Sequence, residues 1–209
     1  MNFLFVGCSI TWGDELEDRF NSRYSKIVSD ALGANETNIA QCGQSNDWIA
    51  RRTVEETRKK RYDRVYVQLT IPSRLEYFTE DGSYKFSPQM VKQKEKAYYI
   101  QGRWYYKTVW NKQLGIENMY KNKFIIENAL DFRTQLVFLS TDCCPEGKKK
   151  NRHLHENSYW NRLCKVDNIW IWKDILGSYP TTIDMIGEKG HPLEPAHLKI
   201  ANYLISHGK

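Results

Sequence analysis

Apolar runs of strand length alternate with amphipathic stretches in the first third of the chain. Residues 3–6 are wholly apolar and end at Gly7, a pattern typical of a parallel strand buried on both faces. In residues 22–32 the apolar side chains share one helix face, and Gly33 is a suitable C-terminal stop. We therefore predict a strand, a loop and a helix over this stretch.

The same alternation continues to residue 69. Strands are predicted at residues 37–40 and 65–69, and a helix at residues 47–60 lies between them. Ser45 or Asn46 is placed to cap that helix, because both side chains can accept a bond from its first backbone N–H groups. Repeated strand–helix–strand order predicts a parallel sheet covered by helices.

The regular pattern is interrupted once and then resumes. Residues 76–115 are polar, aromatic and basic, and we interpret them as an insertion that forms a hairpin or short helices. A helix at residues 116–132 and a strand at residues 135–140 follow, then an irregular or helical stretch at 160–176 and a last helix at 193–206. The 209 residues therefore predict one α/β domain.

Composition indicates an ordinary soluble protein. Charged residues make up 27% and hydrophobic residues 41%, no apolar run is long enough for a membrane span, and the N-terminus lacks signal-peptide features. The five cysteines include no CxxC pair, and His153 and His155 have no acid or cysteine at metal-ligand spacing. We expect reduced thiols, a cytoplasmic location, no membrane association, no metal and no cofactor.

Ligands of open parallel sheets bind beyond the carboxyl ends of the strands, so the loop after the first strand is a candidate site. It contains Gly7-Cys8-Ser9-Ile10-Thr11-Trp12-Gly13. A serine on such a tight turn faces the ligand crevice, and neighbouring N–H groups can bind a developing oxyanion. Ser9 is therefore a candidate nucleophile.

The second candidate group lies just before the last predicted helix. His191 precedes Pro192, which keeps it extended, and Glu188 lies three residues upstream, where its carboxylate can set the imidazole tautomer. Glu194 and His197 have the same spacing, but they fall within or at the start of the helix. We prefer His191 as the base.

These two segments resemble sequence blocks of the SGNH (GDSL-like) hydrolase family. Its first block, Gly-Asp-Ser-x-(Ser/Thr), is similar to Gly7-Cys8-Ser9-Ile10-Thr11, and its last block, Asp-x-x-His-Pro, is similar to Glu188-Lys189-Gly190-His191-Pro192. The resemblance implies a three-layer, flavodoxin-like α/β fold with Ser9 as nucleophile, His191 as base and an acid. Glu188 stands where the family has Asp, and Asp184 is the alternative acid.

The resemblance also implies an oxyanion hole formed by Ser9 and the second-block glycine, which Gly43 matches. The third-block Asn is absent, and Asn46 is the candidate replacement. We also assign Thr11 and Trp12, which follow Ser9 in the same loop, to substrate contact.

Arg74 lies in the loop that lacks the third-block Asn. It either faces the site and binds an anionic substrate group, or forms an ion pair with Glu76 or Asp47.

The predicted insertion differs from the rest of the chain in charge. Residues 81–123 contain nine Lys or Arg and three Asp or Glu, so this stretch alone accounts for the net charge of +6. Rings are interleaved with these cations, as in surfaces that bind sugars or nucleic acid. We expect a lid selecting a sugar-bearing or anionic substrate, a nucleic-acid or protein-binding face, or a small core with a solvated basic rim.

Two functions follow. The first is a serine-dependent hydrolase of acyl or acetyl esters, acting on a small molecule or glycan. The alternative is a non-catalytic binding module on the same scaffold, which binds nucleic acid or a protein partner through the basic aromatic insertion.

Overall fold

Five parallel strands form the centre of the protein. The structure is a computed structural model that describes residues 1–80, 82–88, 99–141, 152–177 and 185–207. The strands pair in the order β2-β1-β3-β6-β7. Their bounds are β1 Asn2–Val6, β2 Asn35–Asn38, β3 Arg64–Leu69, β6 Gln135–Ser140 and β7 Asn168–Trp170. The predicted parallel sheet is confirmed.

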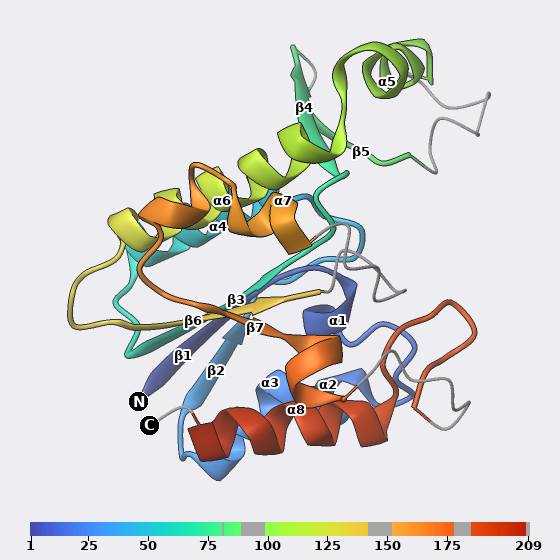
Figure 1. The fold of residues 1–209 in the computed structure, drawn as a ribbon. Coiled ribbons are helices and arrows are strands. Elements are labelled where there is room, and N and C mark those ends of the chain that lie inside the picture. The colour runs from blue at the N-terminus through green and yellow to red at the C-terminus, as the bar shows by residue number, and fades with distance from the viewer. Residues whose placement is uncertain (81, 89–98, 142–151, 178–184, 208–209) are drawn as a thin grey trace.

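Helices cover both faces of the sheet and make three layers (Figure 1). One layer contains α3 (Tyr24–Ala31) and α8 (Glu194–His207), and the other contains α4 (Asn46–Lys59) and α6 (Lys112–Ala129). Alternate side chains of β1 enter the two cores: Leu4 and Val6 pack on the α4 side, and Phe3 and Phe5 on the α3 side. All four are fully buried, which explains the unbroken apolar run of the first strand.

The structure divides the predicted helix at residues 22–32. Arg23 is extended, with ψ of 144°, and separates α2 (Arg19–Ser22) from α3. Its guanidinium binds the Glu36 carboxylate at 2.8 Å, so a tertiary ion pair accompanies the break. The loop predicted at residues 8–21 also contains the short helix α1 (Ser9–Trp12).

The stretch predicted as irregular or helical contains a strand that the sequence did not predict. It comprises η4 (Asn161–Leu163), the three residues of β7 and the π-helix η5 (Ile171–Ile175), and α7 (Arg152–Glu156) precedes them. Trp172 is buried in the core. Among the described residues, no helix has the length and hydrophobicity that crossing a membrane requires.

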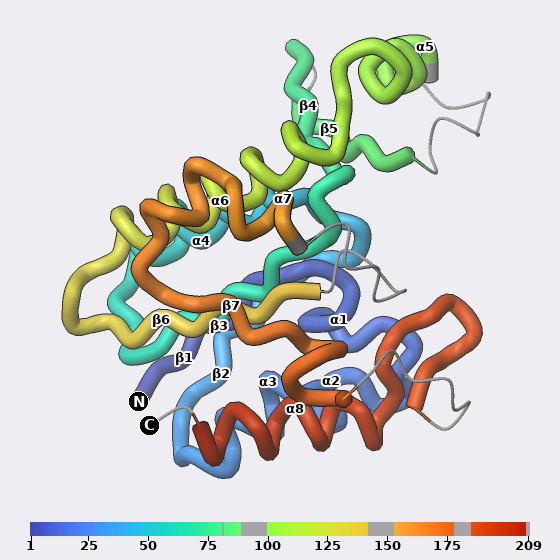
Figure 2. Tube along the Cα trace, viewed as in Figure 1, coloured from blue at the N-terminus to red at the C-terminus, as the bar shows by residue number. Residues whose placement is uncertain are grey.

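The predicted insertion forms both a hairpin and short helices. Strands β4 (Leu75–Thr79) and β5 (Gly82–Phe86) are antiparallel, and α5 (Tyr99–Trp104) continues into the π-helix η2 (Tyr105–Val109). We call the described residues of this region, 75–80, 82–88 and 99–109, the β4–α5 segment. In Figure 2 this segment extends beyond one end of the sheet and of the helices that cover it. The Arg51 guanidinium binds the Glu76 carboxylate at 2.6 Å and joins the segment to α4.

Candidate active site

Ser9 follows β1 after Gly7 and Cys8 and is the first residue of α1. Gly7 is required for this turn, because a Cβ at that position would lie 2.3 Å from Thr11 Oγ1 and 2.9 Å from Gln68 Cβ. The Gln68 Oε1 atom accepts bonds from the Cys8 N–H at 3.1 Å and the Thr11 hydroxyl at 3.2 Å. The strand β3 therefore holds the serine turn in place through one amide side chain.

Thr11 has a structural role in this turn. It is fully buried, and its hydroxyl also bonds to the Tyr24 hydroxyl at 2.8 Å. The prediction that Thr11 contacts substrate is therefore replaced by a packing role. Trp12 is half-buried, with the Arg19 guanidinium 4.2 Å from its ring centroid, and it remains a predicted substrate contact.

His191 lies in a turn that ends at α8, as predicted. The Gly187 N–H donates to the His191 carbonyl at 2.9 Å, and Ile186 and Pro192 form a β-bridge. Gly190 has a φ of +84°, in the left-handed region that favours glycine. The turn therefore has a defined backbone that presents the imidazole.

The carboxylate that contacts the His191 imidazole belongs to Glu15. The sequence did not predict this role for Glu15. Glu15 Oε2 is 3.0 Å from His191 Nδ1. The same carboxylate accepts the N–H groups of Lys189 at 2.8 Å and His191 at 3.0 Å. A Cβ on Gly187 would lie 2.6 Å from the Glu15 carboxyl group, so this glycine leaves the space that the carboxylate fills.

This environment stabilises the ionised form of Glu15. Burial opposes ionisation, but the two backbone N–H groups and the imidazole outweigh it and lower the pKa of Glu15. Glu15 also has a φ of +69°, a strained conformation for a residue with a Cβ. Strain of this kind often marks a functional position, and here it directs the carboxylate into the histidine turn.

Glu188 does not take the predicted position. It is exposed, and in the described part of the chain no hydrogen bond or ion pair joins it to His191. The reason is that Glu15 approaches from the serine loop and fills the space inside the turn. Asp184, the alternative acid, lies outside the described residues.

The serine loop and the histidine turn are joined by adjacent acids. The Asp14 N–H donates to the Ser9 carbonyl at 3.0 Å, and Asp14 Oδ2 lies 3.6 Å from His191 Nδ1. The chain from Ser9 to Glu15 therefore leads from the candidate nucleophile directly to the imidazole. Ser9 and His191, 182 positions apart in the sequence, therefore lie on two loops that Asp14 and Glu15 bring into contact.

His197, the rival base, belongs to the core. Its side chain is fully buried, its Nδ1 accepts the Tyr24 N–H at 3.1 Å, and its ring stacks on Tyr24. Burial lowers the pKa of His197 to about 4. A neutral, packed imidazole at the α3–α8 contact supports the preference for His191.

Gly43 lies in the loop between β2 and α4, and Asn46 is the first residue of α4. Gly43 has a φ of +75°, so glycine is favoured there. The Ser45 hydroxyl accepts the Trp48 N–H at 3.2 Å, which confirms Ser45 as the cap of α4. Asn46 is buried, and its amide donates to the Thr70 carbonyl at 3.1 Å and accepts the Thr70 N–H at 2.8 Å. Asn46 therefore joins two loops, and the structure gives it a positioning role rather than that of an oxyanion donor.

Arg74 occupies the loop where the family has its third-block Asn. Its Nη1 donates to the Thr70 hydroxyl at 2.9 Å and to the Gln44 carbonyl at 3.4 Å. The predicted ion pair is not formed, because Glu76 binds Arg51, and Asp47 accepts bonds from Asn118 and Asn122.

Arg74 also acts on Cys8, the neighbour of Ser9. Burial favours the neutral thiol, but the Arg74 charge and hydrogen bonds from Thr70, Ile10 and Gln68 lower the pKa of Cys8. Arg74 therefore acts electrostatically on the first-strand loop, and its binding of an anionic substrate group stays a prediction.

A second cation reaches the loop from the β4–α5 segment. The Lys85 ammonium donates to the Cys42 carbonyl at 2.9 Å. A Cβ on Gly43 would lie 3.2 Å from this ammonium nitrogen. The sequence did not predict this contact, because nothing in the local pattern of β5 indicates which loop the lysine meets.

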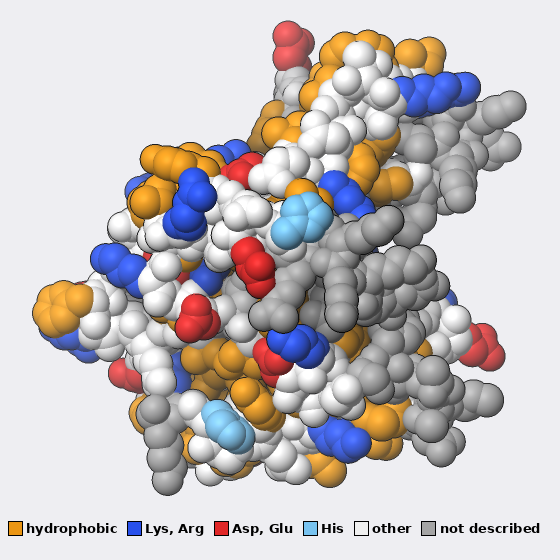
Figure 3. Space-filling view, in the orientation of Figure 1, with side chains coloured by type: hydrophobic (Ala, Val, Ile, Leu, Met, Phe, Trp, Pro, Cys, Tyr) orange, Lys and Arg blue, Asp and Glu red, His pale blue; other side chains and the backbone are white. Residues whose placement is uncertain are grey.

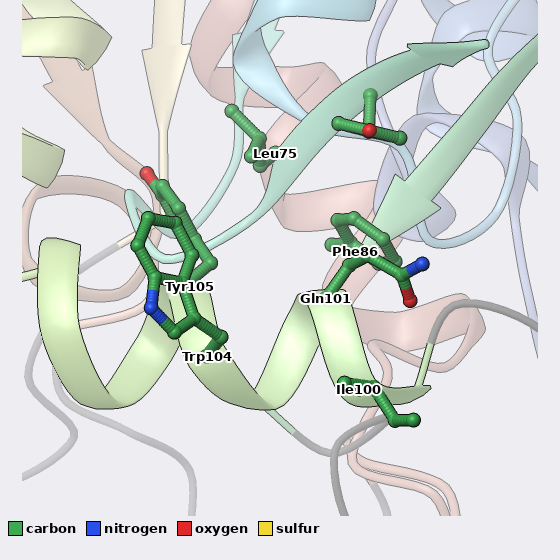
Figure 4. A pocket seen from close by; sticks show the side chains of 7 residues that line it. Leu75, Phe86, Ile100, Gln101, Trp104 and Tyr105 are labelled. Carbon is green, nitrogen blue, oxygen red and sulfur yellow. The ribbon is translucent and has the colours of Figure 1, made fainter.

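The β4–α5 segment also contains an apolar cavity of about 360 Å³ (Figure 4). It lies between the hairpin and α5, and its lining residues are Leu75, Tyr77, Phe86, Ile100, Gln101, Trp104 and Tyr105. Leu75 and Phe86 are paired in register and share a face, whereas Lys85 belongs to the opposite face of β5. One face of the hairpin therefore lines the cavity while the other meets the candidate site.

The predicted nucleic-acid surface remains a prediction. Lys92, Lys94 and Lys96 lie outside the described residues. On the face drawn in Figure 3, the basic side chains that are described stand among acidic and polar ones, and hydrophobic side chains gather near α5.

The structure describes three of the five cysteines and both histidines considered as metal ligands. Cys8, Cys42 and Cys164 are free thiols, whereas Cys143 and Cys144 lie outside the described residues. His155 packs on Tyr120 and Trp170. Within the described ranges, no group of three or more potential metal ligands is found.

Solved structures resemble this chain over nearly its whole length. No protein-family model and no curated protein sequence matches it. TesA aligns with a TM-score of 0.61 and 11% identity, covering 98% of this chain and 96% of TesA. A lipolytic G-D-S-L family protein from Veillonella parvula gives 0.58 and 12%, covering 99% and 97%. The psychrotrophic esterase EstA from Pseudoalteromonas sp. gives 0.57 and 11%, covering 98% and 94%.

Sequence identities this low carry information on fold rather than on substrate. The chain aligns over almost its whole length with these neighbours, and its five-stranded parallel sheet covered by helices is the architecture that the alignment supports. The protein has the three-layer α/β fold of the SGNH (GDSL-like) hydrolases.

Proposed function

We propose that the protein is a serine ester hydrolase whose catalytic set is Ser9, His191 and Glu15. The observation that carries the proposal is the 3.0 Å contact between Glu15 Oε2 and His191 Nδ1. A partly buried carboxylate that contacts Nδ1 leaves Nε2 to act as the base and stabilises the imidazolium that forms. The loop that supplies this acid is the one that begins with Ser9.

The reaction follows from these roles. Ser9 Oγ attacks the acyl carbon while His191 Nε2 takes the hydroxyl proton, and the same proton then passes to the leaving alcohol. Water, deprotonated by His191, attacks the acyl-serine and releases the acid. The backbone N–H groups of Ser9 and Gly43 are proposed to bind the oxyanion, with Glu15 ionised throughout.

Acyl and acetyl esters of small molecules or glycans are the proposed substrates. Solved structures with this fold include TesA and the esterase EstA, which was also solved inhibited by monoethylphosphonate. A phosphonate is therefore a suitable first probe of Ser9. We retain the non-catalytic binding module as the alternative, since the β4–α5 segment has an apolar cavity of its own.

Fluorophosphonate labelling, followed by intact mass measurement, tests the proposal. We expect a single adduct on the wild type, no adduct on Ser9→Ala and slow labelling of His191→Ala, because the serine is activated only by its base. Ser206→Ala serves as the control, since Ser206 is exposed on α8 and should not be the labelled serine. An adduct that persists in Ser9→Ala would contradict the proposal, as would no adduct under conditions that label a known esterase.

A further inference from the structure

The loop that contains the proposed oxyanion glycine is bracketed by two cations from different elements. Lys85 of β5 donates to the Cys42 carbonyl at 2.9 Å, and Arg74 donates to the Gln44 carbonyl at 3.4 Å. Carbonyl groups two residues apart are separated by about 7 Å at most, so the two charges stand on either side of Gly43. Both side chains therefore end at the loop that contains the proposed oxyanion glycine.

In the ranges that the structure describes, neither charge is neutralised, because no carboxylate there forms an ion pair with Lys85 or Arg74. The nearby acids are engaged elsewhere: Glu76 binds Arg51, and Glu15 binds the histidine turn. Asp14 lies beside His191. The pKa of the Cys42 thiol is raised to about 11, first by burial and then by the nearby Asp14 carboxylate.

Lys85 and Arg74 also have N–H donors beyond those that the structure shows in hydrogen bonds. An ammonium has three donors and a guanidinium has five, whereas the structure shows one bond from the exposed Lys85 and two from Arg74. Unused donors that carry positive charge are suited to the oxygens of a carboxylate or phosphate. The neutral Asn that the family resemblance implies at the Arg74 loop would offer no such charge.

We propose that Lys85 and Arg74 select esters that carry a carboxylate or phosphate close to the scissile bond. This inference rests on the proposed function and adds a substrate class to it. The apolar face of the hairpin packs against α5, and so the fold leaves Lys85 on the face that meets the site. The β4–α5 segment then acts as a specificity element.

Matched ester pairs, one member charged and one neutral, test the proposal. For an anion on the alcohol side, kcat/KM is compared for 4-acetoxybenzoate and its neutral methyl ester, and for 4-acetoxyphenyl phosphate and its neutral dimethyl phosphate ester. For an anion on the acyl side, monoethyl succinate is compared with diethyl succinate. We expect a preference of about tenfold or more for the charged member of at least one pair, weakening as salt is added.

The variants assign this preference to the two cations. Lys85→Gln and Arg74→Gln should each reduce the charged-to-neutral ratio by about tenfold, and Lys85→Arg should retain most of it. Lys165→Gln is the charge-matched control, since Lys165 is exposed and distant in sequence from both loops. The ester pair that shows the preference indicates whether the selected anion is a carboxylate or a phosphate, and whether it lies on the acyl or the alcohol side of the ester.

Two outcomes would overturn the inference. One is the absence of a preference in every pair, and the other is a preference that survives both Lys85→Gln and Arg74→Gln. Phosphonate labelling of Ser9 separates these results from failure of the proposed function: a labelled enzyme without charge preference refutes only the selection of anionic esters. An unlabelled protein that hydrolyses none of the esters refutes both.

Discussion

The histidine turn and the β4–α5 segment meet the same site in different ways. Residues 187–191 are held by backbone bonds and by one carboxylate that accepts two N–H groups and contacts the imidazole. The β4–α5 segment is joined to the rest by the Arg51–Glu76 pair and reaches the site through the exposed Lys85. The geometry of the histidine turn therefore depends on several polar contacts that act together. The β4–α5 segment instead contributes the charge of a single side chain, which one substitution can remove.

The largest effect is expected for Glu15→Gln. An amide can hold the ring but favours the wrong tautomer and cannot stabilise the imidazolium, so kcat should fall by about 10⁴-fold. Glu188→Gln is the matched control, since its carboxylate is exposed, and it should stay within about twofold of wild type if the acid is Glu15. Ester turnover of the two variants measures the difference, and the reverse ranking would restore Glu188 as the acid.

A smaller loss is expected for Gly187→Ala. The added Cβ would lie 2.6 Å from the Glu15 carboxyl group and would displace it from the turn. A displacement of about 1 Å can cost about 10²-fold in rate, so kcat should decrease by that order. Lys189→Ala keeps the backbone N–H that Glu15 accepts and should retain activity. Equal rates for the two variants would mean that the turn does not depend on the glycine.

Stability, rather than activity, should respond to His197. Its folded-state pKa of about 4 lies below the usual 6.5, so the unfolded chain binds the proton more readily. The stabilisation is therefore fully present above pH 6.5 and is lost as pH falls toward 4, a change of about 3 kcal/mol. Thermal unfolding between pH 4 and 7 should show this slope, and His197→Gln should flatten it. An unchanged slope in the variant would assign the effect to other groups.

The smallest effect is expected for Asn46→Ala. The change leaves the Thr70 N–H and carbonyl without their partner, which costs about 1–3 kcal/mol for a buried group. The melting temperature should fall, and kcat at a temperature well below unfolding should change little. Asn46→Asp, which can still accept the Thr70 N–H, is the comparison variant. A large loss of kcat without loss of stability would return Asn46 to the oxyanion hole.

Local patterns were sufficient for the sheet because β1, β3 and β6 are nearly continuous apolar runs. They were insufficient for β7, since three residues with a polar first position make no periodic signal. The break at Arg23 depends on Glu36, which lies in another element.

In the candidate site, too, local motifs indicated some residues, and others depend on contacts with distant parts of the chain. Ser9, Gly43 and His191 were identified from short motifs, whereas Glu15 and Lys85 act through contacts 176 and 43 positions away. The acidic pair Asp14-Glu15, directly after the serine motif, was the one local signal for the acid. Nothing in local spacing shows which distant turn a side chain will enter.

The distribution of the catalytic set along the chain has a consequence for biosynthesis. The proposed nucleophile and acid are contained in the first 15 residues, and the base is residue 191. A ribosome-bound chain that has completed β1, β2 and β3 therefore holds an acid without its imidazole. Hydrolytic activity is expected to appear abruptly, when the last turn emerges and docks on Glu15, and an ester probe added to stalled nascent chains of graded length would time that event.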